Sequence, residues 1–167
     1  MNVTCFTQET RREFWTEFDK YISGNIFWSE KKAKGYSRYG HVRLFDSGRN
    51  QVCFSTGALF KPTDKNPDNP NFNEIRVELC IEGASSISID NLEEELLTRI
   101  ENEFGRKVQL TSEKGKRRKL QVHKSVDLSN KDDWPSHFQW LLDNLKIMNK
   151  VFYGIILPGI THNQNEA

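Results

Sequence analysis

The sequence predicts an α+β domain with a mainly antiparallel five-stranded sheet and three helices packed on one face of it. Residues Glu74–Glu82 alternate strictly between apolar and polar side chains, as a strand with one buried face does. Three other segments place apolar residues at helical spacing. The remaining β-rich runs come in pairs joined by short polar segments, which favours antiparallel hairpins. The expected order along the chain is α-β-β-β-α-β-β-α.

The first element predicted is a helix near the start of the chain. Phe14, Phe18 and Ile22 recur at helical spacing. Thr7 is of a type that caps helix N-termini, and Gly24 stands where such a helix would stop. The segment therefore offers one apolar face to a core.

A hairpin and a long loop are predicted next. Two β-rich runs, Tyr39–Asp46 and Gln51–Thr56, are separated by four polar or glycine residues that suit a hairpin loop. Residues Lys61–Asn73 then hold three of the five prolines, among Asn and Asp residues. This composition resists both helix formation and ladder pairing, so the stretch is predicted as a loop inside one domain.

Residues Glu74–Glu82 are predicted as the strand around which the sheet is organised. The outer face is polar and is expected to be solvated, with Arg76 placed between Glu74 and Glu78. The inner face is apolar and is expected to join the core; it consists of Ile75, Val77, Leu79 and Ile81.

A second helix and a second hairpin follow that strand. Asp90 and Glu93 form a capping pair in front of an apolar periodic segment that closes at Gly105. Two short strands, one around Leu110 and one around Leu120, flank a turn-like segment.

A third helix completes the core. Asp132 and Asp133 favour the positive end of a helix, and Pro135 is tolerated in its first turn. Apolar residues then repeat at helical spacing as far as Met148.

Length and composition bound the class of protein. A chain of 167 residues suits one domain, predicted over residues 1–160 with a flexible tail at residues 161–167. The formal net charge of +1 shows no global preference for nucleic acid or for an anionic membrane. The longest apolar stretch, Val151–Ile160, is about half the ~20 residues that a membrane helix needs. We therefore expect a cytoplasmic protein without membrane contact.

The sequence predicts no catalytic residue, no metal site and no cofactor. The three cysteines are widely spaced without a C-x-x-C motif, which argues against a disulfide framework and a structural zinc site. No glycine motif for nucleotide phosphates occurs. Glu74, Glu78 and Glu82 stand about 13 Å apart from one to the next along a strand, so they cannot share an ion unless other strands supply ligands. A non-catalytic protein is therefore the leading interpretation.

Local charge is the strongest functional signal. Arg106–Lys124 contains eight basic residues and one acidic residue, whereas Asp90–Glu103 contains six acidic residues and one basic residue. Phe27–Arg43 mixes aromatic and basic residues, a combination suited to stacking on bases and holding phosphates. If the two stretches share a surface, DNA or RNA is the natural ligand. The predicted contacts are Arg117, Arg118, Lys119, Lys116, Arg43, Trp28, Tyr36 and Tyr39.

Other interpretations stay open. The basic residues could pair with acids of the second helix or of the Glu74–Glu82 strand, which would give a neutral, solvated face. The outer sheet face and the aromatic residues could instead serve a protein partner or a homodimer.

Four segments resemble a bacterial and archaeal family catalogued as a domain of unknown function. They are Arg11–Phe18, Ile75–Ile81, Ile100–Gly105 and Asp133–Trp134, and the similarity spans about Thr7 to Phe152. In that family the domain occurs by itself or behind a region similar to nucleases, which implies a role in DNA metabolism or phage defence. The resemblance supplies no catalytic residues, and it adds a metal-dependent nuclease as a second alternative function. The chain has Thr111 where relatives often have Trp.

Overall fold

A computed structural model describes residues 8–23, 39–46, 51–59, 74–82, 94–113 and 117–158. Within these ranges, the side chains of residues 8, 9, 11, 39–46, 51–59, 82, 95, 96, 112, 113 and 117 are not described. The predicted N-cap Thr7, the capping pair Asp90 and Glu93, the proline-rich loop and the tail at residues 161–167 lie outside the described residues.

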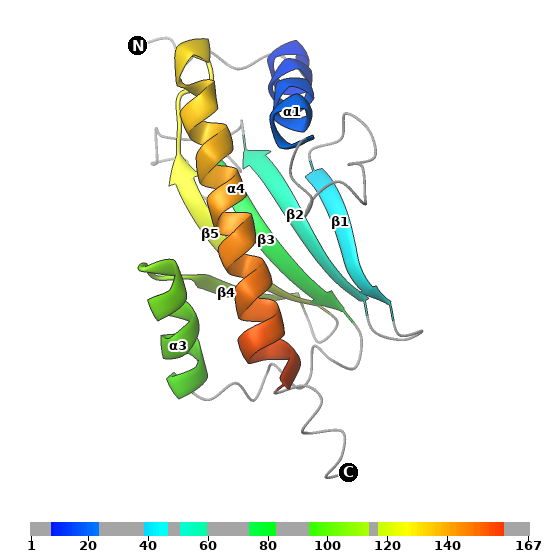
Figure 1. The fold of residues 1–167 in the computed structure, drawn as a ribbon, viewed down its shortest axis with the longest axis vertical. Helices are drawn as coiled ribbons and strands as arrows, with labels where there is room; N and C mark the ends of the chain where they lie inside the picture. Colours follow the sequence, from blue (N-terminus) through cyan, green and yellow to red (C-terminus); the bar gives the residue numbers. More distant parts are fainter. Residues whose placement is uncertain are drawn as a thin grey trace.

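The strands pair throughout in antiparallel fashion, in the order β1-β2-β3-β5-β4. β3 lies in the middle, between β2 and β5 (Figure 1). Among the described strands, β4 follows α3 in the chain and pairs with β5 at the end of the strand order. The strands are β1 (Tyr39–Asp46), β2 (Gln51–Leu59), β3 (Glu74–Glu82), β4 (Gln109–Glu113) and β5 (Arg117–Ser125).

Helix α4 runs diagonally across the sheet and contacts β3 (Figure 1). Helices α1 and α3 both contact α4, so the three helices form one layer on the same side of the sheet. A 3₁₀ turn precedes α4 and a π-helical turn continues it, a feature that the sequence did not predict. The helical elements are α1 (Gln8–Ile22), α3 (Glu94–Phe104), the 3₁₀ turn (Lys131–Asp133), α4 (Trp134–Val151) and the π-helix (Phe152–Ile156).

The packing in the predicted fold needs a correction. The α+β class is right and the backbones of five strands pair in one sheet, but the described core under the helices is built on three of these strands. In the described side-chain packing, the layer under the helices consists of three antiparallel strands, β3, β5 and β4. The reason is that α3 and the π-helix that follows α4 meet residues of these three strands around one apolar centre. Backbone pairing continues from β3 to β2 and β1.

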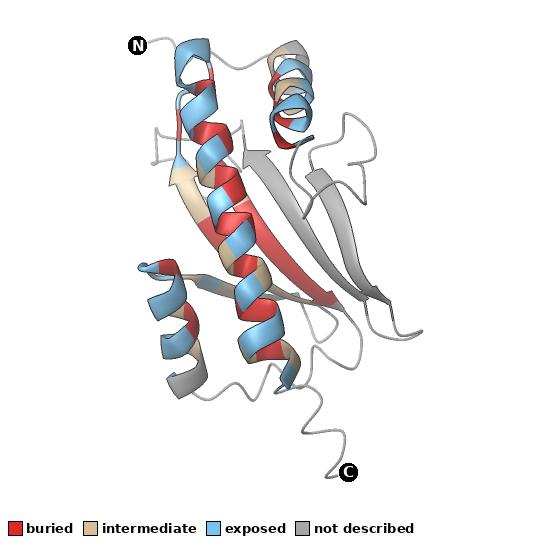
Figure 2. Ribbon diagram, viewed as in Figure 1, coloured by how far each residue is buried: buried red, intermediate tan, exposed pale blue. Residues whose placement is uncertain are grey.

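The inner face of β3 forms the centre of the core, as predicted. Ile75, Val77, Leu79 and Ile81 are each at most 2% exposed. Figure 2 shows β3 buried along most of its length, and α4 with buried and exposed faces alternating at helical spacing. Alternation of period two in the strand and about 3.6 in the helix brings the two apolar surfaces together.

An aromatic cluster joins α1 to α4. The ring of Phe14 lies 5.3 Å from the ring of Trp134, at an interplanar angle of 84°, and 5.0 Å from that of Phe138. The Nε1 of Trp134 donates a hydrogen bond of 3.0 Å to the buried carbonyl of Leu128. Edge-to-face pairs of this kind are worth ~0.5–1.5 kcal/mol beyond the area that they bury. The cluster fixes the start of α4 against α1.

No helix in the described ranges is long and apolar enough to span a membrane.

Candidate functional site

The sheet places the acidic strand and the basic strand side by side. Glu82 of β3 is in register with Arg117 of β5, Cys80 with Lys119, and Glu78 with Gln121. These positions share the outer face, away from α4, because residues two apart on a strand lie on the same face. The outer face of β3 and β5 is therefore the candidate site.

The centre of this face is buried, which corrects the prediction of a solvated polar surface. Glu78 and Cys80 are each 5% exposed and Gln121 is 7% exposed. A carboxylate at this depth requires partners, because an uncompensated buried charge is strongly unfavourable. The partners come from both β3 and β5.

Two polar side chains lie next to the carboxylate of Glu78. The side-chain amide of Gln121 donates a hydrogen bond to Oε2 of Glu78. The Nε of Arg76 lies 3.8 Å from the same oxygen. In this environment Glu78 holds β3 and β5 together rather than pointing freely at solvent.

A second polar pair crosses the same two strands. Nδ1 of His123 lies 2.9 Å from Oε1 of Glu74, so the carboxylate fixes the orientation of the imidazole. The Nε2 of His123 is buried and has no hydrogen-bond partner among the described residues. The sequence analysis missed this pair because Glu74 and His123 are 49 positions apart, and only the strand pairing brings them together.

The acids of α3 are paired with other lysines. Oε2 of Glu101 lies 2.7 Å from Nζ of Lys107, and Oε2 of Glu103 lies 2.6 Å from Nζ of Lys150. The hydrogen bond from Lys107 lowers the pKa of Glu101. Lys107 belongs to the basic stretch Arg106–Lys124, so Glu101 of α3 neutralises one of its eight cations, whereas Glu103 is engaged by Lys150 of α4.

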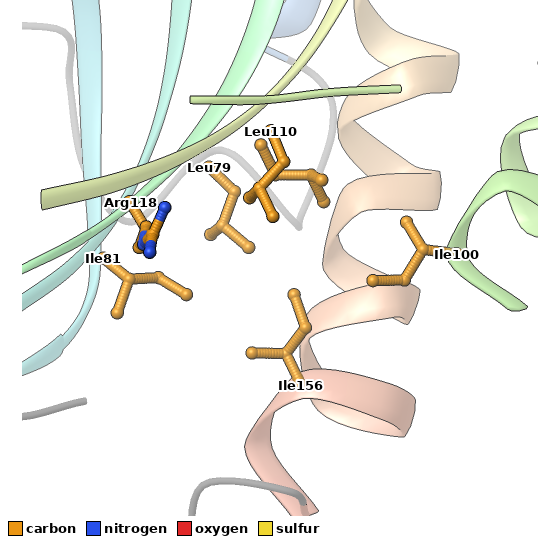
Figure 3. A pocket seen from close by; sticks show the side chains of 7 residues that line it. Leu79, Ile81, Ile100, Leu110, Arg118 and Ile156 are labelled. Atoms are coloured by element: carbon orange, nitrogen blue, oxygen red, sulfur yellow. The ribbon is translucent and has the colours of Figure 1, made fainter. Parts of the chain in front are cut away.

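Arg118 lies on the inner side of the sheet. It is in register with Ile81, an inner-face residue, and it lines a small cavity whose other walls are apolar (Figure 3). The three consecutive basic residues at 117–119 therefore cannot all face the same way, since neighbouring strand residues point to opposite faces. The remaining lining residues are Leu79, Ile81, Ile100, Leu110, Leu120 and Ile156.

The ladder connects the two basic stretches that the sequence singled out. Arg43 of β1 is in register with Cys53 of β2, which is in register with Cys80, and Cys80 is in register with Lys119. Arg43 and Lys119 therefore stand in one row of the sheet, three strands apart, at ~14 Å for a strand spacing of about 4.8 Å.

The other predicted contacts are placed as follows. Tyr39 opens β1, in register with Gly57 of β2. Arg117 opens β5. Lys116, Trp28 and Tyr36 lie outside the described residues.

In the described part of the chain, no group of three or more His, Cys, Asp or Glu side chains converges in a way that could hold a metal ion. The glutamates of β3 whose contacts are described are instead held apart, Glu74 by His123 and Glu78 by Arg76 and Gln121.

Comparison with known proteins gives a family and no function. No curated protein and no solved structure matches the chain. Residues 10–156 match the family described as "Domain of unknown function (DUF4268)". This range runs from within α1 to the end of the π-helix, so it covers the described helices and strands apart from the first two residues of α1. The chain therefore belongs to the DUF4268 family.

Proposed function

We propose that the chain is a non-catalytic module that binds the phosphate backbone of DNA or RNA through basic residues of β1 and β5, on either side of the buried centre of the outer face. The observation that carries this proposal is the row that contains Arg43 and Lys119. It brings the two basic stretches of the sequence into one sheet, as a shared binding surface requires. Backbone binding needs cations spread along a surface, and it needs no catalytic group.

The distribution of the acids also supports the proposal. Glu74, Glu78, Glu101 and Glu103 are four of the acids of β3 and α3. Each has a described partner, respectively His123, Arg76 with Gln121, Lys107 and Lys150. Glu82, in register with Arg117, is the acid nearest along the ladder to the basic end of β5. These four acids are therefore already engaged by other side chains.

The proposed contacts are the outer-face positions of the basic strand and their neighbours. Arg117 and Lys119 contact phosphates together with Lys116 and Arg43, and Trp28, Tyr36 and Tyr39 stack on bases. Arg118 is the exception, because it lines an apolar cavity on the opposite side. The family resemblance to domains that follow nuclease-like regions agrees with a role in DNA metabolism or phage defence.

The test is a salt titration of binding to labelled single- and double-stranded DNA and RNA. We expect the parent chain to bind at low salt, with affinity falling as salt rises. Each lost phosphate contact lowers the magnitude of the log–log salt slope by about 1, so Arg117→Ala with Lys119→Ala should lower it by about 2. Arg118→Leu removes the adjacent charge from the other side of the sheet and should leave the slope nearly unchanged.

A second control removes the same charge at lysines that are already paired. Lys131 contacts Glu13 at 2.5 Å and Lys150 contacts Glu103 at 2.6 Å. The double variant Lys131→Ala, Lys150→Ala should bind almost as the parent does. Absence of binding to all four nucleic acids at low salt would rule out the proposed function. An equal loss of affinity in the variant Arg117→Ala, Lys119→Ala and in the variant Lys131→Ala, Lys150→Ala would also rule it out.

A further inference from the structure

Two cysteines that are far apart in sequence are direct neighbours in the sheet. Cys53 of β2 and Cys80 of β3 are Cα partners in the antiparallel ladder. Directly opposite residues in such a ladder have Cα atoms about 4.5 or about 5.5 Å apart, depending on the hydrogen-bonding position. Disulfides span Cα separations of about 4.4–6.8 Å. Both ladder positions fall inside this range, so a bond between the two cysteines requires little backbone movement.

The register of this strand pair is continuous. β2 and β3 pair from Gln51 with Glu82 to Leu59 with Glu74 without a shift, whereas the irregularity in the sheet lies between β1 and β2. This uninterrupted register places Cys80 directly opposite Cys53.

We propose that Cys53 and Cys80 form a cross-strand disulfide with each other when the chain folds in the presence of a low-molecular-weight disulfide oxidant such as oxidised glutathione. Cys80 is a buried thiol in the structure. One cysteine of the pair, as thiolate, attacks the sulfur of the oxidant, forms a mixed disulfide and releases one small thiol. The thiolate of the other cysteine attacks the mixed disulfide and releases the second small thiol. The pair loses two electrons and two protons, and the oxidant is reduced to two thiols.

The bond would join the central strand to its neighbour covalently. It would also close the segment between β2 and β3, which includes the proline-rich stretch, into a loop. Because Arg43 and Lys119 stand at the two ends of the same row, the bond would form between the two cations of the proposed phosphate contacts. The disulfide itself rests on the ladder geometry and not on nucleic-acid binding.

The experiment uses the full chain, refolded from denaturant in buffers with increasing ratios of oxidised to reduced glutathione. Refolding lets both thiols react before Cys80 becomes buried, so the result does not depend on access in the folded state. We expect the thiol count to fall from three to one per chain, with a peptide that links Cys53 to Cys80. Circular dichroism checks that each product is folded.

Matched variants separate this pair from other reactions. Cys5→Ser should still lose two thiols, because the cysteine that it removes lies outside the pair. Cys53→Ser should form no intramolecular disulfide. The proposal is overturned if Cys5→Ser keeps both thiols throughout the series, or if the mapped disulfide contains Cys5. It is also overturned if oxidation yields only bonds between chains.

Discussion

At the scale of single residues, His137 is buried, and its ring nitrogens lack hydrogen bonds to the described residues. It lies on α4 and is 6% exposed, and neither ring nitrogen has a hydrogen-bond partner among the described residues. Burial lowers the pKa of His137, and the positive charge of Lys124 lowers it further, while Asp133 and Asp127 act in the opposite direction. The folded chain therefore holds a neutral imidazole at a pH where the unfolded chain begins to bind a proton.

The sign of the pH dependence follows from this lowered pKa. The stabilising effect of the neutral form is fully present above the ordinary value of 6.5 and decreases as the pH falls toward the lower pKa of the folded state. Asp127 also has a lowered pKa, caused chiefly by hydrogen bonds from Ser129. The contribution of Asp127 to stability decreases only as the pH falls toward and below 3.8, the ordinary pKa of an Asp carboxyl. The effects of His137 and Asp127 therefore occupy different pH ranges.

We predict that His137→Leu makes the chain more stable and less sensitive to pH. The variant removes two buried polar atoms without partners, each of a kind that costs about 1–3 kcal/mol, and we expect a net gain of about 1 kcal/mol in unfolding free energy. Urea unfolding at about pH 7.5 and about pH 5.5 measures both effects. A variant that loses as much stability between these two pH values as the parent would show that another group is responsible.

At the residue scale, the sequence predicted core residues but not the polar contacts between strands. The inner face of β3 could be predicted because alternation is a local property of the chain. The pairing of Glu74 with His123 and the inward position of Arg118 could not, because both depend on which strand lies beside β3. The run of basic residues at 117–119 looked like one surface, although strand geometry divides it between two sides of the sheet.

At the scale of secondary-structure elements, the end of α3 shows how one glycine terminates a helix. Gly105 has a φ of 63°, in the left-handed region. Its N–H donates to the carbonyl of Asn102, and the N–H of Arg106 donates to the carbonyl of Glu101, both at 3.3 Å. This is the Schellman arrangement, which satisfies carbonyls that would otherwise lack partners at the helix end.

We predict opposite effects of alanine at the two described glycines outside the strands. Gly105→Ala should lower the unfolding free energy by about 1–2 kcal/mol, because an L-residue is strained at positive φ. Gly154→Ala should raise it by about 0.5–1 kcal/mol, because Gly154 lies in a helical turn and a Cβ there meets nothing within 4 Å. Thermal and denaturant unfolding of both variants would test this. Equal shifts in the same direction would contradict the role assigned to the positive φ.

The helices and hairpins were predictable because each is encoded over a short stretch. The third helix was expected to run to about Met148, whereas α4 continues to Val151 and then widens into a π-helix. A π-helical turn has no local sequence pattern of its own, and here it places Ile156 against α3 and the sheet.

At the scale of the whole molecule, β3 is the most enclosed element in the described part of the chain. α4 covers its inner face, and its outer-face residues Glu78 and Cys80 are also buried. Both edges of the strand are hydrogen bonded, to β2 and to β5. A strand enclosed on both faces and both edges should open only when the whole fold opens.

We predict that the amides of β3 exchange with deuterium at the rate set by global unfolding. Amides of β4, a strand at the end of the sheet order, should exchange faster through local opening. Mass spectrometry of peptides from β3 and β4, compared with the global stability from denaturant titration, measures the difference. Protection of β3 well below the global value would mean that the outer side of the sheet opens independently.

The strand order β1-β2-β3-β5-β4 also has a consequence during synthesis of the chain. β3 can pair with β2 as soon as it is made, but its other edge waits until β5 has been translated, more than 30 residues later. α4, which covers the apolar face of β3, is translated later still. A nascent chain therefore passes through a stage in which its most apolar strand has one open edge and one bare face. At that stage other nascent chains and chaperones compete with β5 and α4 for the same strand.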